Sequence, residues 1–105
     1  MQEFQIKRSQ VKNFRTTMVE SLTDIFGTQP HDVGGKFEIT YGAMKRLAVW
    51  VGEGERSLCV ESESRSDVPD EVILDTNRRF RQYLEKVTGY TAKERVKMAK
   101  KMEED

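Results

Sequence analysis

Apolar and polar residues alternate along three consecutive segments in the middle of the chain, at residues 36–41, 45–51 and 56–61. A period of two places the apolar side chains of a strand on one face, so each segment predicts a half-buried β-strand. Glycines lie between the segments and mark two turns. We therefore expect an antiparallel meander with one apolar face.

The N-terminal part of the chain predicts one strand followed by one helix. Residues 3–7 alternate like a short strand, and residues 11–26 carry apolar side chains at the three-and-four spacing of an amphipathic helix. Ser9 is the expected helix cap, and Gly27 is expected to end the helix. The following segment, residues 28–35, contains a proline and a glycine pair and predicts a loop without regular structure.

A second amphipathic helix is expected to begin at Pro69, with Asp67 or Asp70 as its cap. Thr76 and Asn77 interrupt its apolar stripe. Buried polar groups need hydrogen-bond partners, and we expect these two side chains to find them on loop backbone. A ligand or a subunit contact is the alternative that the sequence leaves open.

The segment after this helix predicts a helix boundary. Gly89 fits a helix C-terminus, and Thr91 with Glu94 three residues later has the spacing of a capping box. A third helix is therefore expected over residues 92–102, with few apolar residues and many basic ones. Whether this helix covers Trp50 is left open.

The order of expected elements is β-α-β-β-β-α-α within one domain, residues 1–105. Runs of strands flanked by helices predict an α+β fold of two layers, with an antiparallel sheet. Helices one and two should pack on one face of this sheet. The residues expected on that face are Phe4, Ile6, Phe37, Ile39, Tyr41, Leu47, Val49, Val51, Leu58 and Val60.

Two long stretches of the sequence resemble a known family. They read TYGAMKRLAVWV and LDTNRRFRQYLEKVTGYTAKER, and the resemblance extends from about Phe37 onward. The family consists of small uncharacterised archaeal proteins that share a domain of unknown function. The resemblance implies a small archaeal cytoplasmic protein, and it carries over no functional residue because the family has no assigned activity.

Composition limits the chemistry that the chain can perform. One histidine, His31, and one cysteine, Cys59, cannot form a zinc set or an internal disulfide. His31 lies in a loop without a neighbouring nucleophile, and Cys59 in a strand is more typical of a packing residue than of a nucleophile. We expect no enzyme, no metal and no cofactor. The absence of a long apolar run predicts a cytoplasmic protein that does not span a membrane.

The charges cancel in number but not in position. The chain has 18 basic and 18 acidic residues, yet residues 53–75 are mostly acidic and residues 76–101 mostly basic. Such asymmetry points weakly to an anionic partner, although solvated helix faces show it too. The residues expected on a basic surface of helices two and three, together with a tyrosine and a threonine at their junction, are Arg78, Arg81, Tyr90, Thr91, Lys93, Arg95, Lys97 and Lys100.

Three functions are compatible with these patterns. The first is a non-enzymatic interaction module, expected to be a homodimer, that uses an edge strand or the reverse sheet face with Ala48, Trp50 and Cys59. The second is a nucleic-acid-binding accessory protein that uses the basic surface. The third is a small-anion-binding protein or enzyme at the amino end of the third helix.

Overall fold

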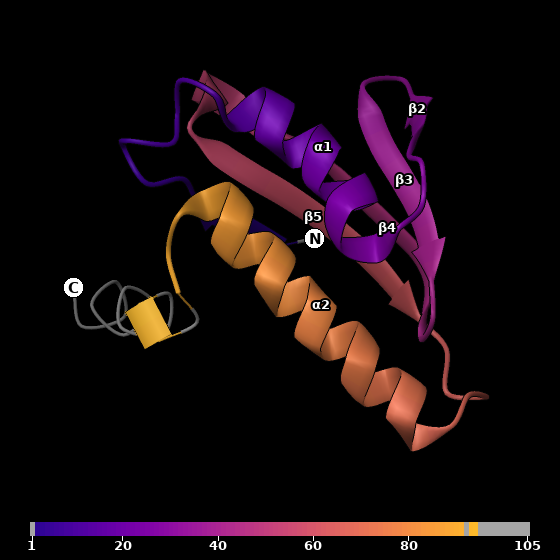
Figure 1. Ribbon diagram of the computed structural model, residues 1–105. Helices are drawn as coiled ribbons and strands as arrows, with labels where there is room; N and C mark the ends of the chain where they lie inside the picture. The colour runs from indigo at the N-terminus through magenta and orange to yellow at the C-terminus, as the bar shows by residue number, and fades with distance from the viewer. Residues whose placement is uncertain (1, 92, 95–105) are drawn as a thin grey trace.

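The computed structural model describes residues 2–91, 93 and 94, which form two helices on a five-stranded sheet (Figure 1). The elements in chain order are β1 (Gln2–Gln5), α1 (Phe14–Phe26), β2 (His31–Val33), β3 (Lys36–Tyr41), β4 (Met44–Val51), a 3₁₀ turn (Glu53–Glu55), β5 (Ser57–Ser64) and α2 (Asp70–Thr88). The α+β class, the four predicted strands and the first two predicted helices are confirmed, with one strand more than the sequence predicted. No helix in the described part of the chain is long and apolar enough to cross a membrane.

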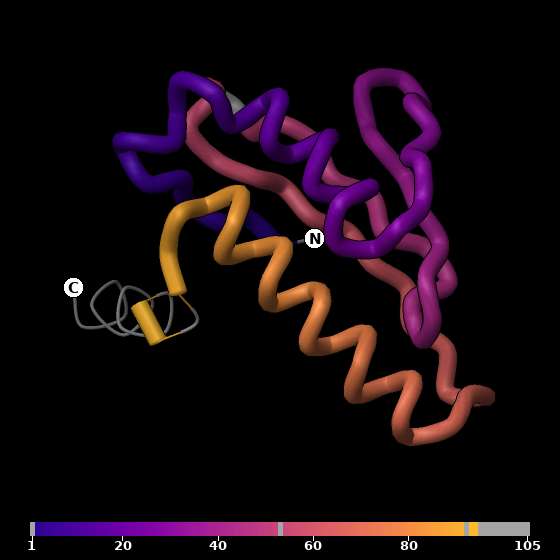
Figure 2. Tube along the Cα trace, viewed as in Figure 1, coloured from indigo at the N-terminus to yellow at the C-terminus, as the bar shows by residue number. Residues whose placement is uncertain are grey.

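The sheet is antiparallel throughout and has the strand order β1-β5-β4-β3-β2. Strands β2 to β5 follow one another as consecutive neighbours. The N-terminal strand instead lies at the other edge and pairs with β5, so that Gln2 lies opposite Val60 and Gln5 opposite Ser57. Figure 2 shows this start of the chain running behind α2. The first strand of the chain therefore pairs with the last strand at one edge of the sheet.

The prediction of an irregular loop over residues 28–35 is wrong at residues 31–33. These residues form β2, which pairs with β3 through a tight hairpin at Gly34 and Gly35. Both glycines have positive φ, 62° and 89°, a conformation that costs glycine little. Asp32 supports the turn because its Oδ1 accepts a hydrogen bond from Gly35 N at 3.0 Å. The glycine pair thus joins two strands.

The first helix begins later than predicted. It starts at Phe14 and not at residue 11, and Asn13 rather than Ser9 occupies the N-cap position, without a side-chain cap. Backbone bonds hold the preceding residues in turns instead: Gln10 N donates to Lys7 O at 2.7 Å, and Asn13 N donates to Gln10 O at 3.2 Å. Ser9 therefore lies within these turns, before the start of the helix, and it is too far from the first helical amides to cap them.

The predicted side-chain cap of the second helix is also wrong. Pro69 occupies the N-cap position of α2, and neither Asp67 nor Asp70 caps the helix. The Pro69 carbonyl accepts from Val72 N at 3.0 Å, which begins the helical hydrogen bonding. Asp67 forms an ion pair with Arg65 at 3.1 Å instead. Proline fits this position because its fixed φ suits a helix start.

Both helices lie on the same face of the sheet, as predicted (Figure 1). Side chains from α1, from α2 and from alternating positions of β3, β4 and β5 share one hydrophobic core. Its fully covered members include Met18, Leu22, Leu47, Leu58, Val49, Tyr83 and Val87. The Tyr83 hydroxyl donates to the Met18 carbonyl at 2.8 Å, which joins the two helices inside the core.

The predicted helix boundary at the end of α2 is confirmed. Gly89 takes the left-handed conformation, with φ of 81°, and its N–H donates to Glu85 O at 2.9 Å. The capping box has formed as well: Thr91 N donates to Glu94 Oε1 at 3.1 Å, and Glu94 N donates to Thr91 Oγ1 at 3.2 Å. Residues 95–102 of the predicted third helix lie outside the described residues.

Candidate functional site

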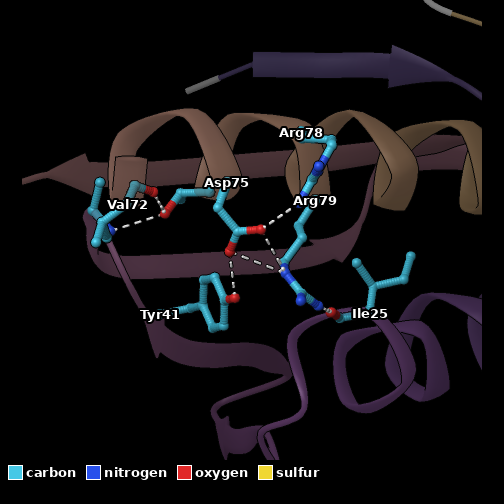
Figure 3. Close-up of polar contacts among 8 residues, drawn as sticks. Ile25, Tyr41, Val72, Asp75, Arg78 and Arg79 are labelled. Carbon is cyan, nitrogen blue, oxygen red and sulfur yellow. Dashed lines mark hydrogen bonds and ion pairs between the residues drawn. The ribbon is translucent and has the colours of Figure 1, made fainter. Parts of the chain in front are cut away.

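A polar cluster ties both helices to the end of β3 (Figure 3). Asp75 of α2 is its centre: it accepts from the Tyr41 hydroxyl at 2.7 Å, from Arg78 at 2.8 Å and from Arg79 Nε at 3.1 Å. Arg79 also donates to the carbonyl of Ile25 near the end of α1. We call Tyr41, Asp75, Arg78 and Arg79 with this carbonyl the Asp75 cluster. It joins α2 to β3 through the Asp75 carboxylate and to α1 through Arg79.

The groups of the Asp75 cluster have the properties of contacts that hold secondary-structure elements together. The hydrogen bond from Tyr41, followed by those from the two arginines, lowers the pKa of Asp75, so this carboxylate stays ionised. The same hydrogen bond raises the pKa of Tyr41, whose hydroxyl stays protonated. Tyr41 is further held between Arg79, 5.4 Å from its ring centre, and the ring of Phe26 at 5.3 Å. Neither group titrates near neutral pH, where an acid or base catalyst works best.

Thr76 satisfies a backbone amide at the β3–β4 turn, as predicted for the polar layer of α2. Its Oγ1 accepts from Ala43 N at 3.0 Å and donates to Val72 O at 2.7 Å. Gly42 lies directly against it, because a Cβ at Gly42 would approach Thr76 Oγ1 to 2.4 Å. Thr76 is buried, whereas Asn77 is exposed and needs no such partner.

The opposite face of the sheet, which we call the outer face, carries a different set of side chains. Strand pairing places its residues in rows across the strands, one of which reads Glu3, Cys59, Trp50, Lys36 and Val33. Neither α1 nor α2 lies on this face (Figure 1). It is therefore the largest surface of the sheet that the described helices leave without a covering layer.

An ionic cluster lies across the middle of the outer face. Arg46 of β4 forms ion pairs with Glu38 of β3 and with Glu61 of β5, the latter at 3.2 Å. Ala48 lies opposite both acids in the strand pairing and is fully buried beneath these side chains. We call Arg46, Glu38 and Glu61 the Arg46 cluster. It accounts for the burial of an alanine on an otherwise open face.

Trp50 is the partly accessible member of the predicted interface. The Lys36 ammonium lies 4.3 Å from the centre of its ring, within the range of a cation–π contact. Ala48 and Cys59, which were predicted to surround an exposed tryptophan, are 0% and 4% exposed. The prediction that these two small residues offer contact surface is therefore wrong, because cross-strand side chains cover them.

Cys59 is a packing residue beside the buried residues Gly52 and Ser57. Its Sγ lies 3.7 Å from Glu3 Oε2, which also accepts from Ser57 Oγ at 2.7 Å. Gly52 makes this packing feasible, since a Cβ there would approach Ser57 Oγ to 2.0 Å. Burial and the negative charge of Glu3 raise the pKa of the Cys59 thiol. A thiol held protonated is a poor nucleophile.

A recess of about 530 Å³ opens beside the Arg46 cluster, toward the β2 edge. His31 and Val33 of β2 line it together with Thr40 and Arg46. Both β2 side chains are exposed, and Val33 retains 54% of its accessible surface. The outer face thus combines a recess, an accessible apolar residue at its edge and a half-buried aromatic ring.

The predicted basic surface is only partly available. Arg78 is bound to Asp75, whereas Arg81 is exposed and forms no ion pair within the described residues. Thr91 is used in the capping box. Tyr90 is half-buried near Lys7, and Lys93 is exposed. The remaining predicted residues, Arg95, Lys97 and Lys100, lie outside the described residues.

Comparison with known proteins identifies the family. The model of a domain of unknown function, DUF5611, matches residues 1–101, which is nearly the whole chain. The chain belongs to the DUF5611 family. The predicted resemblance to a family without assigned activity is therefore confirmed. A comparison with curated proteins finds no match.

A solved structure supports the DUF5611 fold. The chain is similar to a hypothetical protein from Thermoplasma acidophilum determined in solution by NMR, with 22% sequence identity and a TM-score of 0.65. The match covers 94% of this chain and 97% of the other. At this identity the likeness concerns the fold, and it agrees with the archaeal resemblance. Function has to be argued from the residues of this DUF5611 chain.

The residues that sequence reasoning missed are those joined across elements. The alternation of β4 places Arg46 on the reverse face, but the strand register that brings Glu38 and Glu61 beside it is not readable from the pattern. Asp75 and Arg79 lie four residues apart on α2 and form an ion pair, but their contacts with Tyr41 and with Ile25 involve other elements. Within the described residues, no group of three histidines, cysteines or acids is placed to hold a metal ion.

Proposed function

We propose that this DUF5611 protein is a non-enzymatic binding module that pairs with a second copy of itself through the outer face of its sheet. The observation that carries the proposal is the position of Trp50, half-buried on a face that neither described helix covers. Tryptophan is enriched at the energetic centres of interfaces, because its large ring buries much surface with few rotatable bonds.

The charges of the outer face support a second copy as the partner. Lys36 and Arg46 lie among Glu38, Glu61 and Glu63, so cations and acids are interspersed on one surface. A twofold axis brings the same patch of two subunits together, and a patch of mixed sign can then place each cation opposite an acid. A strand of nucleic acid would meet the three carboxylates, which repel phosphate.

We propose a role without catalysis because the protonation and hydrogen bonding of Cys59, Asp75 and Tyr41 do not favour a reaction. The Cys59 thiol has a raised pKa and lies beneath its neighbours, and the Asp75 carboxylate is saturated by three donors. The Tyr41 hydroxyl donates to that carboxylate and also has a raised pKa. No pair of a nucleophile and an adjacent base occurs among these groups.

Light scattering across a concentration series tests the proposal. We expect a dimer mass at high concentration and a weaker dimer for Val33→Glu, which adds a charge at an exposed position of the outer face. Leu74→Glu is the matched control, since Leu74 is the other large exposed apolar residue described, 68% exposed on α2. Its dimer should remain unchanged.

Trp50→Glu is the stronger variant, and circular dichroism must show that it stays folded. We expect it to be monomeric over the whole series. A wild-type protein that remains monomeric at the highest concentration would overturn the proposal, as would a dimer that Val33→Glu and Leu74→Glu weaken equally. Equal weakening would place the contact away from the outer face.

A further inference from the structure

Three segments that are distant in the sequence meet at the end of the sheet near the β4–β5 turn. Ile6 N, just after β1, donates to Arg56 O at 3.0 Å. Lys7 N donates to Thr88 O at the end of α2 at 2.7 Å. These backbone bonds hold the segment after β1, the residue before β5 and the end of α2 together, and they do not involve side chains.

Gly89 allows the close crossing of these segments. A Cβ at this residue would lie 2.7 Å from Gln10 Cγ and 3.0 Å from Lys7 Cβ. Tyr90 follows directly, and its backbone N–H donates to Thr88 Oγ1 at 3.2 Å. The residue after the helix end is therefore positioned by its own backbone, next to the residues that follow β1.

A cavity of about 340 Å³ lies at this meeting point. Ile6, Val11 and Tyr90 supply apolar and aromatic surface, and Arg8 and Arg56 supply two guanidinium groups. The two arginines come from different segments, so their position beside one cavity follows from the backbone arrangement and not from sequence proximity. This cavity is separate from the outer face and from the recess beside the Arg46 cluster.

The positive charge of this cavity is not neutralised within the described residues. Neither Arg8 nor Arg56 forms an ion pair there, although both side chains are exposed. Two acids have other partners: Glu55, the neighbour of Arg56 in sequence, pairs with Arg15, and Glu94, which follows Tyr90, accepts from Thr91 N at 3.1 Å. Two unpaired guanidinium groups beside one cavity attract an anion.

We propose that this cavity binds a small molecule that carries an oxyanion, either a phosphate or a carboxylate, on an apolar or aromatic group. Arg8 and Arg56 would hold the oxyanion, because the planar guanidinium matches both phosphate and carboxylate oxygens with two parallel hydrogen bonds. Ile6 and Val11 would contact the apolar part. The inference does not depend on self-association, which uses a different surface.

Titration of the full chain with phenyl phosphate, phenylacetate and inorganic phosphate, followed by NMR amide shifts, tests this site. We expect saturable shifts for one or both aromatic anions, at Ile6, Arg8, Val11 and Arg56. The tighter of the two identifies phosphate or carboxylate as the preferred oxyanion. Inorganic phosphate should bind more weakly, since it makes no apolar contact, and equal binding would overturn the role of the apolar surface.

Arg8→Gln and Arg56→Gln should each weaken the binding by about tenfold or more, as expected for loss of a charge-assisted hydrogen bond. Both side chains are exposed and the bond to Arg56 uses its backbone, so the fold should persist. Arg81→Gln is the control, because it removes the same charge from an exposed arginine of α2 that also lacks a described ion pair.

Two results would overturn the inference: shifts that do not saturate with any of the three anions, or an equal loss of affinity in Arg81→Gln and in the two cavity variants. The Val33→Glu variant separates this inference from the proposed dimer. It should bind the anion as the wild type does even where its self-association is lost.

Discussion

The two polar clusters on opposite faces of the sheet both contain ion pairs between arginines and carboxylates, but they connect different parts of the structure. In the Asp75 cluster one carboxylate of α2 receives a tyrosine from β3 and two arginines of its own helix, and one of these arginines also binds the Ile25 carbonyl of α1. In the Arg46 cluster one arginine holds two carboxylates from neighbouring strands, on the face without a described helix. The first joins elements that the sheet hydrogen bonds do not connect. The second joins strands that already pair.

The difference shows which charges are available to a partner. The Asp75 cluster adds polar contacts from α2 to β3 and to the end of α1, so its groups are already used within the fold. Breaking the Arg46 cluster leaves the strand pairing intact, because backbone bonds hold β3, β4 and β5 together. The side chains of the Arg46 cluster are 22% to 43% exposed, and ion pairs that keep contact with solvent contribute little to stability. The outer-face charges are therefore free to serve recognition, and the following experiments test this contrast.

Substitution of Thr76 should have the largest effect on stability. Thr76→Val keeps the shape of the side chain but leaves the buried Ala43 N–H without its acceptor, which should lower the free energy of unfolding by about 2 kcal/mol. Urea denaturation measures this change. Thr40→Val is the matched control: Thr40 bonds to Lys45 O at an exposed site of the outer face, and we expect a change within about 0.5 kcal/mol.

An equal loss for the two threonine variants would contradict the contrast between the covered and the outer face. It would show that the polar contacts of both faces stabilise the fold alike.

The pH dependence of stability should report on the Asp75 cluster. The folded pKa of Asp75 is lowered below its ordinary value of 3.8, so the unfolded state binds the proton more readily. Its contribution is fully present above that ordinary value and is lost as the pH falls through the folded pKa. Urea denaturation at decreasing pH should therefore show a decline that is shallower in Asp75→Asn.

The control for this pH series is Asp67→Asn. Asp67 also has a lowered pKa, through its hydrogen bond from Arg65, but the pair is confined to an exposed loop. We expect its removal to change the pH profile less than Asp75→Asn does. Identical profiles for the wild type and Asp75→Asn would mean that the cluster contributes nothing to folding.

Substitution of Ser21, on the covered face, should increase the stability of the fold. Its hydroxyl is fully buried in α1 and has no hydrogen-bond partner among the described residues. Alanine removes this unsatisfied group and favours the helix, so Ser21→Ala should raise the free energy of unfolding by about 1 kcal/mol. Thermal or urea denaturation measures it. A loss of stability would show that the hydroxyl has a partner after all.

The smallest effect on stability is expected at the outer face. Arg46→Gln removes both ion pairs of the Arg46 cluster, yet its melting temperature should fall less than that of Thr76→Val. The same variant should weaken self-association, because Glu38 and Glu61 then face the partner without their cation. A large fall in melting temperature with unchanged association would reverse the roles of the two clusters.

Local patterns predicted much of the fold. Alternation located β3, β4 and β5, three-and-four spacing located α1 and α2, and Gly89 and the Thr91 capping box marked the helix end. These signals involve neighbours in the sequence. Thr76 was also identified correctly as a polar residue that satisfies loop backbone, because it interrupts an otherwise apolar stripe.

The sequence could not specify contacts between distant segments. The hairpin at Gly34 and Gly35 was read as a loop because β2 is only three residues long. The burial of Ala48 depends on side chains of two other strands, and the cavity with Arg8 and Arg56 depends on three segments. Periodicity indicates which face a residue occupies, but strand order and register determine what lies beside it.

The fluorescence of Trp50 on dilution tests the central claim most directly, because Trp50 is the single tryptophan of the chain and lies on the outer face. If two copies pair through this face, its emission should shift to longer wavelength over the same concentrations at which light scattering shows the mass falling to that of a monomer. An emission spectrum that stays constant while the dimer dissociates would contradict pairing through the outer face.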